Sequence, residues 1–67
     1  MDWMDGLNRI LRIDEQELAL LDEMMRYAPG EHMRRMLRMM MAREREEMRM
    51  IREMMMGGHM DSGGPLY

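Results

Sequence analysis

The sequence predicts an all-α fold, an antiparallel helical hairpin that dimerises into a four-helix bundle. Three observations lead to this prediction. Strand signals are absent, because no β-branched run alternates with polar residues anywhere in the 67 residues. Two long segments instead carry apolar residues at the spacing of one helical face. A single turn signal, the stretch YAPGE at 27–31, separates the two segments and indicates a hairpin with one short loop.

The first predicted helix covers about residues 7–27. It begins as early as Trp3 if Asp2, rather than Asp5, is the N-cap. On a wheel of about 100° per residue, its arginines and most of its acids lie on one side. The other side is one broad apolar face, formed by Ile10, Ile13, Leu18, Leu20, Leu21, Met24, Met25 and Ala28.

The second predicted helix covers about residues 30–56. Pro29 suits the first turn of a helix, and the pair Gly57–Gly58 ends it. Residues 1–56 are therefore the hairpin domain, and residues 57–67 are a flexible Gly-rich tail. The second helix has its own apolar face, formed by Met33, Met36, Leu37, Met40, Met41, Met48, Ile51, Met54 and Met55.

Composition narrows the class of protein. The net charge is −3 and the arginines are interleaved with glutamates, which argues against a nucleic-acid partner. The absence of Cys excludes disulfides and thiolate metal sites. No segment approaches the roughly 18 apolar residues of a membrane span, and residues 1–12 do not resemble a signal peptide. We therefore expect a cytoplasmic protein with neither a nucleic-acid nor a membrane partner.

A chain of this length forms only a marginal core by itself. Each predicted helix also has a wider apolar face than one neighbouring helix can cover. Pairing of hairpins would bury the remainder. We therefore expect a homo-oligomer, either a dimer or a multiple of dimers. The apolar residues are dominated by Met, 15 in all, with no Phe, and Met suits irregular or adaptable packing.

Four carboxylates interrupt the apolar faces. Asp14 and Glu17 lie within the face of the first helix, and Glu44 and Glu47 lie near the centre of the face of the second. Each pair is spaced i, i+3, so its members lie one turn apart on the same side. In an antiparallel hairpin, one register places Glu17 opposite Glu44 and Asp14 opposite Glu47. The same register also aligns the apolar residues, so all four acids are expected at one level.

Inward carboxylates at one level require a counter-charge or protonation. Oxygen ligands of this kind suit Fe, Mn, Mg or Ca, and facing helices of a bundle commonly supply them. The sequence therefore predicts a metal site formed by Asp14, Glu17, Glu44 and Glu47. The alternative is a structural ion pair in which Arg12 or Arg43 of a partner subunit neutralises the acids.

This pattern resembles the ferritin-like superfamily, in which one helix supplies a Glu and its partner supplies Glu-x-x-His. In form it is most similar to the encapsulated ferritins, two-helix chains that complete a four-helix bundle and an iron site by dimerising. In AREREEMRMI, Glu44 matches the Glu of that motif, and Glu47 stands where the His is expected. Glu17 matches the Glu of the first helix. The resemblance covers roughly residues 10–55.

The resemblance implies iron, or manganese, held between paired hairpins, and a ferroxidase-type activity. It also implies residence inside a protein compartment. The tail, residues 57–67, has the layout of a linker followed by a docking peptide and is therefore a candidate segment for binding a protein partner. The rival function is a metal-free structural or adaptor bundle that binds a protein partner through its Met-rich surface.

The methionines also allow a copper interpretation. Met33, Met36 and Met39 follow one another at i, i+3, and thioethers suit Cu(I). Because Met33, Met36 and Met40 are equally explained as core residues, the sequence favours packing. His32 lies roughly 18 Å along the helix from Glu44, too far to join the carboxylates within one chain.

Overall fold

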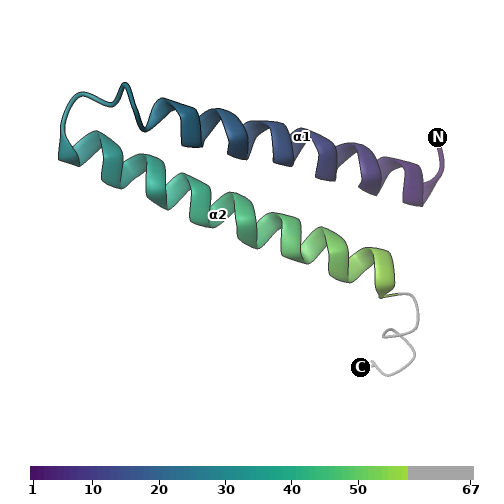
Figure 1. Ribbon diagram of the computed structural model, residues 1–67. Coiled ribbons are helices and arrows are strands. Elements are labelled where there is room, and N and C mark those ends of the chain that lie inside the picture. Colours follow the sequence, from purple (N-terminus) through teal and green to yellow (C-terminus); the bar gives the residue numbers. More distant parts are fainter. Residues whose placement is uncertain (58–67) are drawn as a thin grey trace.

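The computed structural model describes residues 1–57, which form a hairpin of two α-helices (Figure 1). Helix α1 spans Trp3–Met24 and helix α2 spans Glu31–Met56. Residues 1–57 contain no strand, so the all-helical hairpin is confirmed. The predicted tail lies, after Gly57, outside the described residues. Within residues 1–57, neither helix contains a stretch long and apolar enough to cross a membrane.

The ends of α1 follow from local hydrogen bonds. The Asp2 side chain accepts a hydrogen bond of 2.7 Å from the backbone N–H of Asp5, so α1 begins at Trp3, the earlier of the two starts considered from the sequence. At the other end, three successive N–H groups donate to carbonyls only three residues back. This tighter turn ends α1 at Met24 and occupies residues 25–27, which the sequence assigned to the helix.

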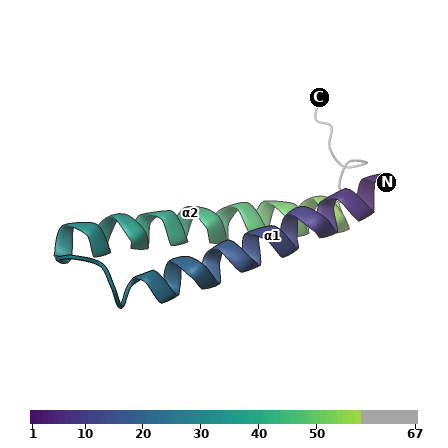
Figure 2. The ribbon, with the colours of Figure 1, turned by 90° about the horizontal axis from the view of Figure 1, so that it is seen from above.

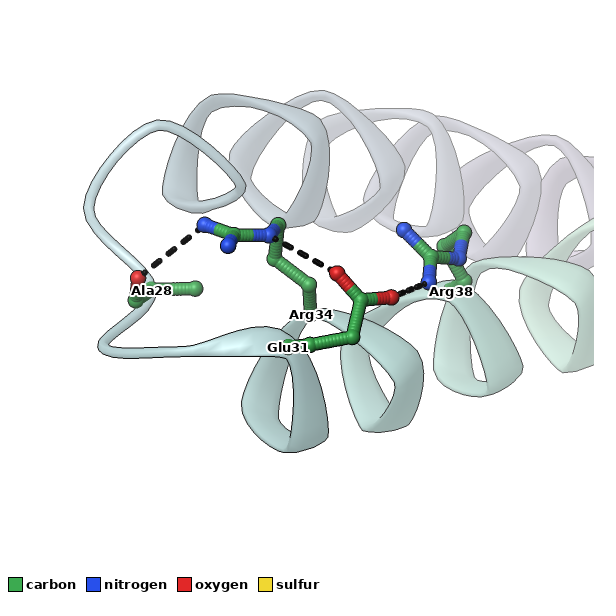
Figure 3. Close-up of polar contacts among 4 residues, drawn as sticks. All are labelled: Ala28, Glu31, Arg34 and Arg38. Carbon is green, nitrogen blue, oxygen red and sulfur yellow. Dashed lines mark hydrogen bonds and ion pairs between the residues drawn. The ribbon is translucent and has the colours of Figure 1, made fainter.

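The loop between the helices depends on one glycine and one charged cluster. Gly30 has φ 102°, a left-handed conformation that suits a residue without a side chain, and it caps α2. Immediately after it, Glu31 accepts hydrogen bonds from both Arg34 and Arg38 (Figure 3). Arg34 also donates to the carbonyl oxygen of Ala28 at 3.4 Å. These contacts join the loop to the first turns of α2.

The helices contact each other along a narrow seam with a seven-residue repeat. On α1 the repeat is Leu7, Asp14 and Leu21, and on α2 it includes Glu44 and Ile51, all of them buried. Half-buried or buried residues complete the seam between these positions: Leu11, Leu18 and Met25 on α1, and Leu37, Met41, Met48 and Met55 on α2. This spacing is that of two helices packed side by side with a shallow crossing, as Figures 1 and 2 show together.

The seam uses only part of the apolar faces expected from the sequence. Ile13 and Leu20, expected in the core, are 59% and 57% exposed. The physical reason is that each helix has one neighbour, which covers a single stripe. A second stripe remains open, and we call it the apolar face; its residues are Ile10, Ile13, Leu20, Met24, Met33, Met36, Met40, Met50 and Met54.

Candidate metal centre

The hairpin brings carboxylates of both helices together halfway along the seam. Asp14, Glu17 and Glu44 each offer one carboxylate oxygen, and these three atoms all lie within 4.8 Å of one another. Asp14 is 5% exposed and Glu44 is 8% exposed, so two charged side chains occupy positions that apolar residues occupy elsewhere in the seam. The four predicted residues Asp14, Glu17, Glu44 and Glu47 are called the carboxylate cluster below.

Burial divides the cluster into an inner and an outer pair. Asp14 and Glu44 lie in the seam, whereas Glu17 and Glu47 are exposed. Glu47 still interacts with the inner pair, because a hydrogen bond with Asp14 and the charge of Asp14 raise the pKa of Glu47. The sequence placed all four acids inside the apolar faces. In the structure, Glu17 lies one turn along α1 from Asp14, and Glu47 lies one turn along α2 from Glu44. Both outer acids lie in the open stripe defined above as the apolar face, and not in the seam.

One oxygen of each inner carboxylate is not satisfied by the protein. Oδ2 of Asp14 and Oε2 of Glu44 are buried, and neither has a hydrogen-bond partner. A buried oxygen without a partner is costly, because the hydration it had in the unfolded chain is not replaced. These two atoms are therefore free acceptors that point to a missing proton donor or cation.

The electrostatics of the cluster show the same deficit of positive charge. A hydrogen bond with Asp14, burial, and the charges of Asp14, Glu17 and Glu47 together raise the pKa of Glu44 to about 7. A carboxyl with this pKa holds a proton through much of the range in which an ordinary Glu has lost it. Near neutral pH, protonation of Glu44 and binding of a cation are therefore competing ways to relieve the repulsion.

No arginine performs this role within one hairpin. The ion pairs formed within residues 1–57 involve Arg9, Arg34, Arg38, Arg49 and Arg52, and every acid in them lies outside the cluster. Arg43, the expected counter-charge on α2, instead lines a cavity with Met36, Met39 and Met40. Arg12 is exposed and is absent from these ion pairs. A structural ion pair would therefore need an arginine from another subunit.

The donor set is all oxygen. Asp14, Glu17 and Glu44 supply carboxylate oxygens, with Glu47 beside them. His32 is at the start of α2, about three turns from Glu44, and does not contribute. Carboxylate oxygens are hard ligands, which favour Mg²⁺, Ca²⁺, Mn²⁺ or Fe²⁺ over soft ions. The two unpartnered oxygens of the inner pair fit such an ion.

The structure groups the methionines differently from the sequence. Met33 shares a cavity with Met24 of α1, and Met39 lines the neighbouring cavity beside Arg43. Met36 and Met40 line both cavities. The i, i+3 series did not include Met24, because Met24 lies on the other helix and comes near these methionines only when the chain folds back. The position of Met24, three residues before the turn signal, was the available clue.

Comparison with known proteins gave no family assignment: no family model, curated protein or solved structure matched the chain.

Proposed function

We propose that the carboxylate cluster binds a divalent cation and that this cation is iron, with manganese as the alternative. The observation that carries the proposal is the pair of buried, unpartnered oxygens on Asp14 and Glu44, which lie on facing helices at the same level. A bound cation would supply the positive charge that residues 1–57 do not provide, and it would neutralise the repulsion that raises the pKa of Glu44.

The resemblance to the ferritin-like superfamily supports iron within this set of hard ions. In that case Fe²⁺ is the substrate, and dioxygen is the oxidant that removes its electron. The protein's own part would be to collect the ion on Asp14, Glu17 and Glu44 and to release the proton of Glu44 as the ion enters. Glu47 stands where that family has His, so the proposed ligands are carboxylates alone.

The proposal includes pairing of hairpins. Glu17 and Glu47 lie in the same stripes as the exposed residues of the apolar face, with Ile13 and Leu20 on either side of Glu17. A second hairpin covering this face would bury its apolar side chains and place its own outer acids against the first cluster. Each hairpin would then supply half of the ligands, as expected for a bundle closed by a two-fold axis.

The first test is cation binding by the Glu44→Ala variant. Titration of chelator-treated protein with Mn²⁺ or anaerobic Fe²⁺ should show stoichiometric binding in a calorimeter, and Glu44→Ala should abolish it. Glu44→Gln keeps the size of the side chain and should fold, as judged by circular dichroism, yet also lose binding. Glu23→Ala removes an exposed acid outside the cluster and should bind normally. Unchanged binding by Glu44→Gln would overturn the proposal.

The second test concerns pairing. Leu20→Asp places a charge in the middle of the apolar face, at a side chain that is 57% exposed in the hairpin. Analytical ultracentrifugation should show a dimer, or a multiple of dimers, for the natural chain and a smaller species for this variant. Ala19→Asp, on the neighbouring exposed position outside the apolar face, is the control and should keep the assembly. Equal masses for all three chains would exclude pairing through this face.

The apolar face also supports the rival function, a metal-free bundle that binds a protein partner. Its adaptable Met side chains, among them Met33, Met36 and Met50, are 46–48% exposed. Metal analysis of protein purified without chelator separates the two functions. Substoichiometric metal in a stable dimer would favour the rival.

A further inference from the structure

We infer that the loop end of the hairpin is a binding site for a soft monovalent metal ion, Cu(I), separate from the carboxylate cluster. The site is a cavity of about 270 Å³ where the end of α1, the loop and the start of α2 meet. We call it the loop-end cavity. Four thioether side chains line it, together with four other residues that carry no charge: Met24, Met33, Met36 and Met40, with Tyr27, Ala28, Pro29 and Leu37.

The four methionines belong to the apolar face and come from both helices. Met24 comes from α1 and the other three from α2, so both helices contribute thioethers to the lining of the cavity. All four are 44–48% exposed. Their thioether groups are thus not committed to the seam, unlike the buried Met41 and Met48. Long, unbranched Met side chains adjust easily around a small guest.

The choice of residue type supports sulfur chemistry. On α2, Leu37 and Ile51 are the only aliphatic side chains larger than Ala, and every other large apolar residue is Met. Helix α1 forms its own apolar stripes mainly from Leu and Ile. Leu and Met are nearly interchangeable in volume and in helix propensity, so packing alone does not require Met along α2. What Met adds is a sulfur atom, a soft donor that prefers Cu(I) to the hard ions suited to carboxylates.

The two sites share no ligand residue, although the four cavity methionines belong to the apolar face through which hairpins are proposed to pair. The charged cluster of Glu31, Arg34 and Arg38 lies at the same end of the hairpin but does not line the cavity. The carboxylate cluster lies further along the seam, and none of its residues lines the cavity either. Cu(I) binding can therefore succeed or fail whatever the outcome of the Mn²⁺ and Fe²⁺ titrations.

The test compares two fourfold Met→Leu variants. The loop-end variant combines Met24→Leu, Met33→Leu, Met36→Leu and Met40→Leu. The control variant changes four exposed methionines outside the cavity: Met4→Leu, Met50→Leu, Met54→Leu and Met56→Leu. Leu keeps the apolar face and the helices, so circular dichroism and ultracentrifugation should give the natural result for both. Any difference in Cu(I) binding then reports on the sulfur atoms.

The measurement is an anaerobic titration with Cu(I), kept reduced by ascorbate, against a chromogenic Cu(I) chelator. The natural chain and the control variant should bind one ion per hairpin with similar affinity, and the loop-end variant should lose at least tenfold. With ¹³C-labelled Met methyl groups and Ag(I) as a redox-stable substitute, the four cavity signals should shift first. Absence of binding, or an equal loss in both variants, would overturn the proposal and leave the cavity as part of an apolar contact surface.

Discussion

Three successive pairs of facing residues in the seam, called layers here, are packed alike but differ in the polarity of their side chains. The register that sets Asp14 against Glu44 also places Leu7 level with Ile51 towards the chain ends and Leu21 level with Leu37 towards the loop. The layers on either side of the centre are apolar. The central layer contains two buried carboxylates with unpartnered oxygens. The carboxylates of the central layer are therefore not required for hairpin packing, since the neighbouring layers pack with Leu and Ile.

The largest effect on stability is expected when the central layer is made apolar. In the metal-free protein, Asp14→Leu combined with Glu44→Leu should raise the free energy of unfolding by about 1–4 kcal/mol, because apolar side chains replace two buried, mutually repelling carboxyl groups that each have an unpartnered oxygen. Urea denaturation followed by circular dichroism measures this change. The opposite change is expected in the next layer, where Leu21→Ala should lower the free energy of unfolding by about 2–5 kcal/mol.

These two variants also separate the effect of the central layer on stability from its proposed role in binding a cation. The double Leu variant should be more stable and yet bind no Mn²⁺, whereas Leu21→Ala should be less stable and still bind it when folded. A double Leu variant that is less stable than the natural chain would show that Asp14 and Glu44 are held by contacts absent from a single hairpin, such as a partner's arginine.

The stability of the metal-free protein should also depend on pH, because Glu44 has a different pKa in the folded and the unfolded chain. The pKa of Glu44 is raised from 4.5 to about 7, so between these values the folded chain holds a proton that the unfolded chain has lost. The stability of the metal-free protein should therefore fall as pH rises from about 4.5 to about 7, and this fall should be complete above pH 7. Thermal melting across this range provides the measurement.

The affinity for Mn²⁺ should change with pH in the opposite direction to the stability of the metal-free protein. Because the cation must displace the proton of Glu44, Mn²⁺ affinity should increase with pH over that window and then level off. Glu44→Gln is the control, and its melting temperature should vary much less with pH. A natural chain whose melting temperature is flat between pH 4.5 and 7 would contradict the assignment of the proton to the central layer.

Much of the fold was predictable from local sequence. The turn at YAPGE and the stop after Met56 follow from residue preferences that operate within a few positions, whereas the sequence left Asp2 and Asp5 as alternative caps of the first helix. The meeting of carboxylates from both helices was also predictable, because two misfit pairs with equal spacing can face each other once the chain folds back. The register differs from the expected one: the sequence set Glu17 opposite Glu44, whereas in the structure the buried Asp14 faces Glu44. These inferences needed only helix geometry and one turn.

The sequence did not predict which apolar residues are buried in the seam and which remain exposed on the apolar face. A wheel places Ile13 and Leu21 on one broad face, although one is 59% and the other 5% exposed in the hairpin. Which stripe becomes the seam depends on how α1 and α2 cross, and both stripes contain carboxylates and large apolar side chains. For that reason the sequence could not separate the inner acids, Asp14 and Glu44, from the outer acids, Glu17 and Glu47.

The short loop has a consequence for the order in which the hairpin folds. Only residues 25–30 separate the helices, so little chain entropy is lost when the first contacts form beside the loop. Contacts of Arg34 and the layer of Leu21 and Leu37 close over short sequence separations, and the layers beyond them can then close in turn. Contacts between the two helices should therefore form first beside the loop and then progressively towards the chain ends. The two central carboxylates come together only after the loop end is formed, so repulsion between them should slow a late step of folding and leave its nucleus unaffected.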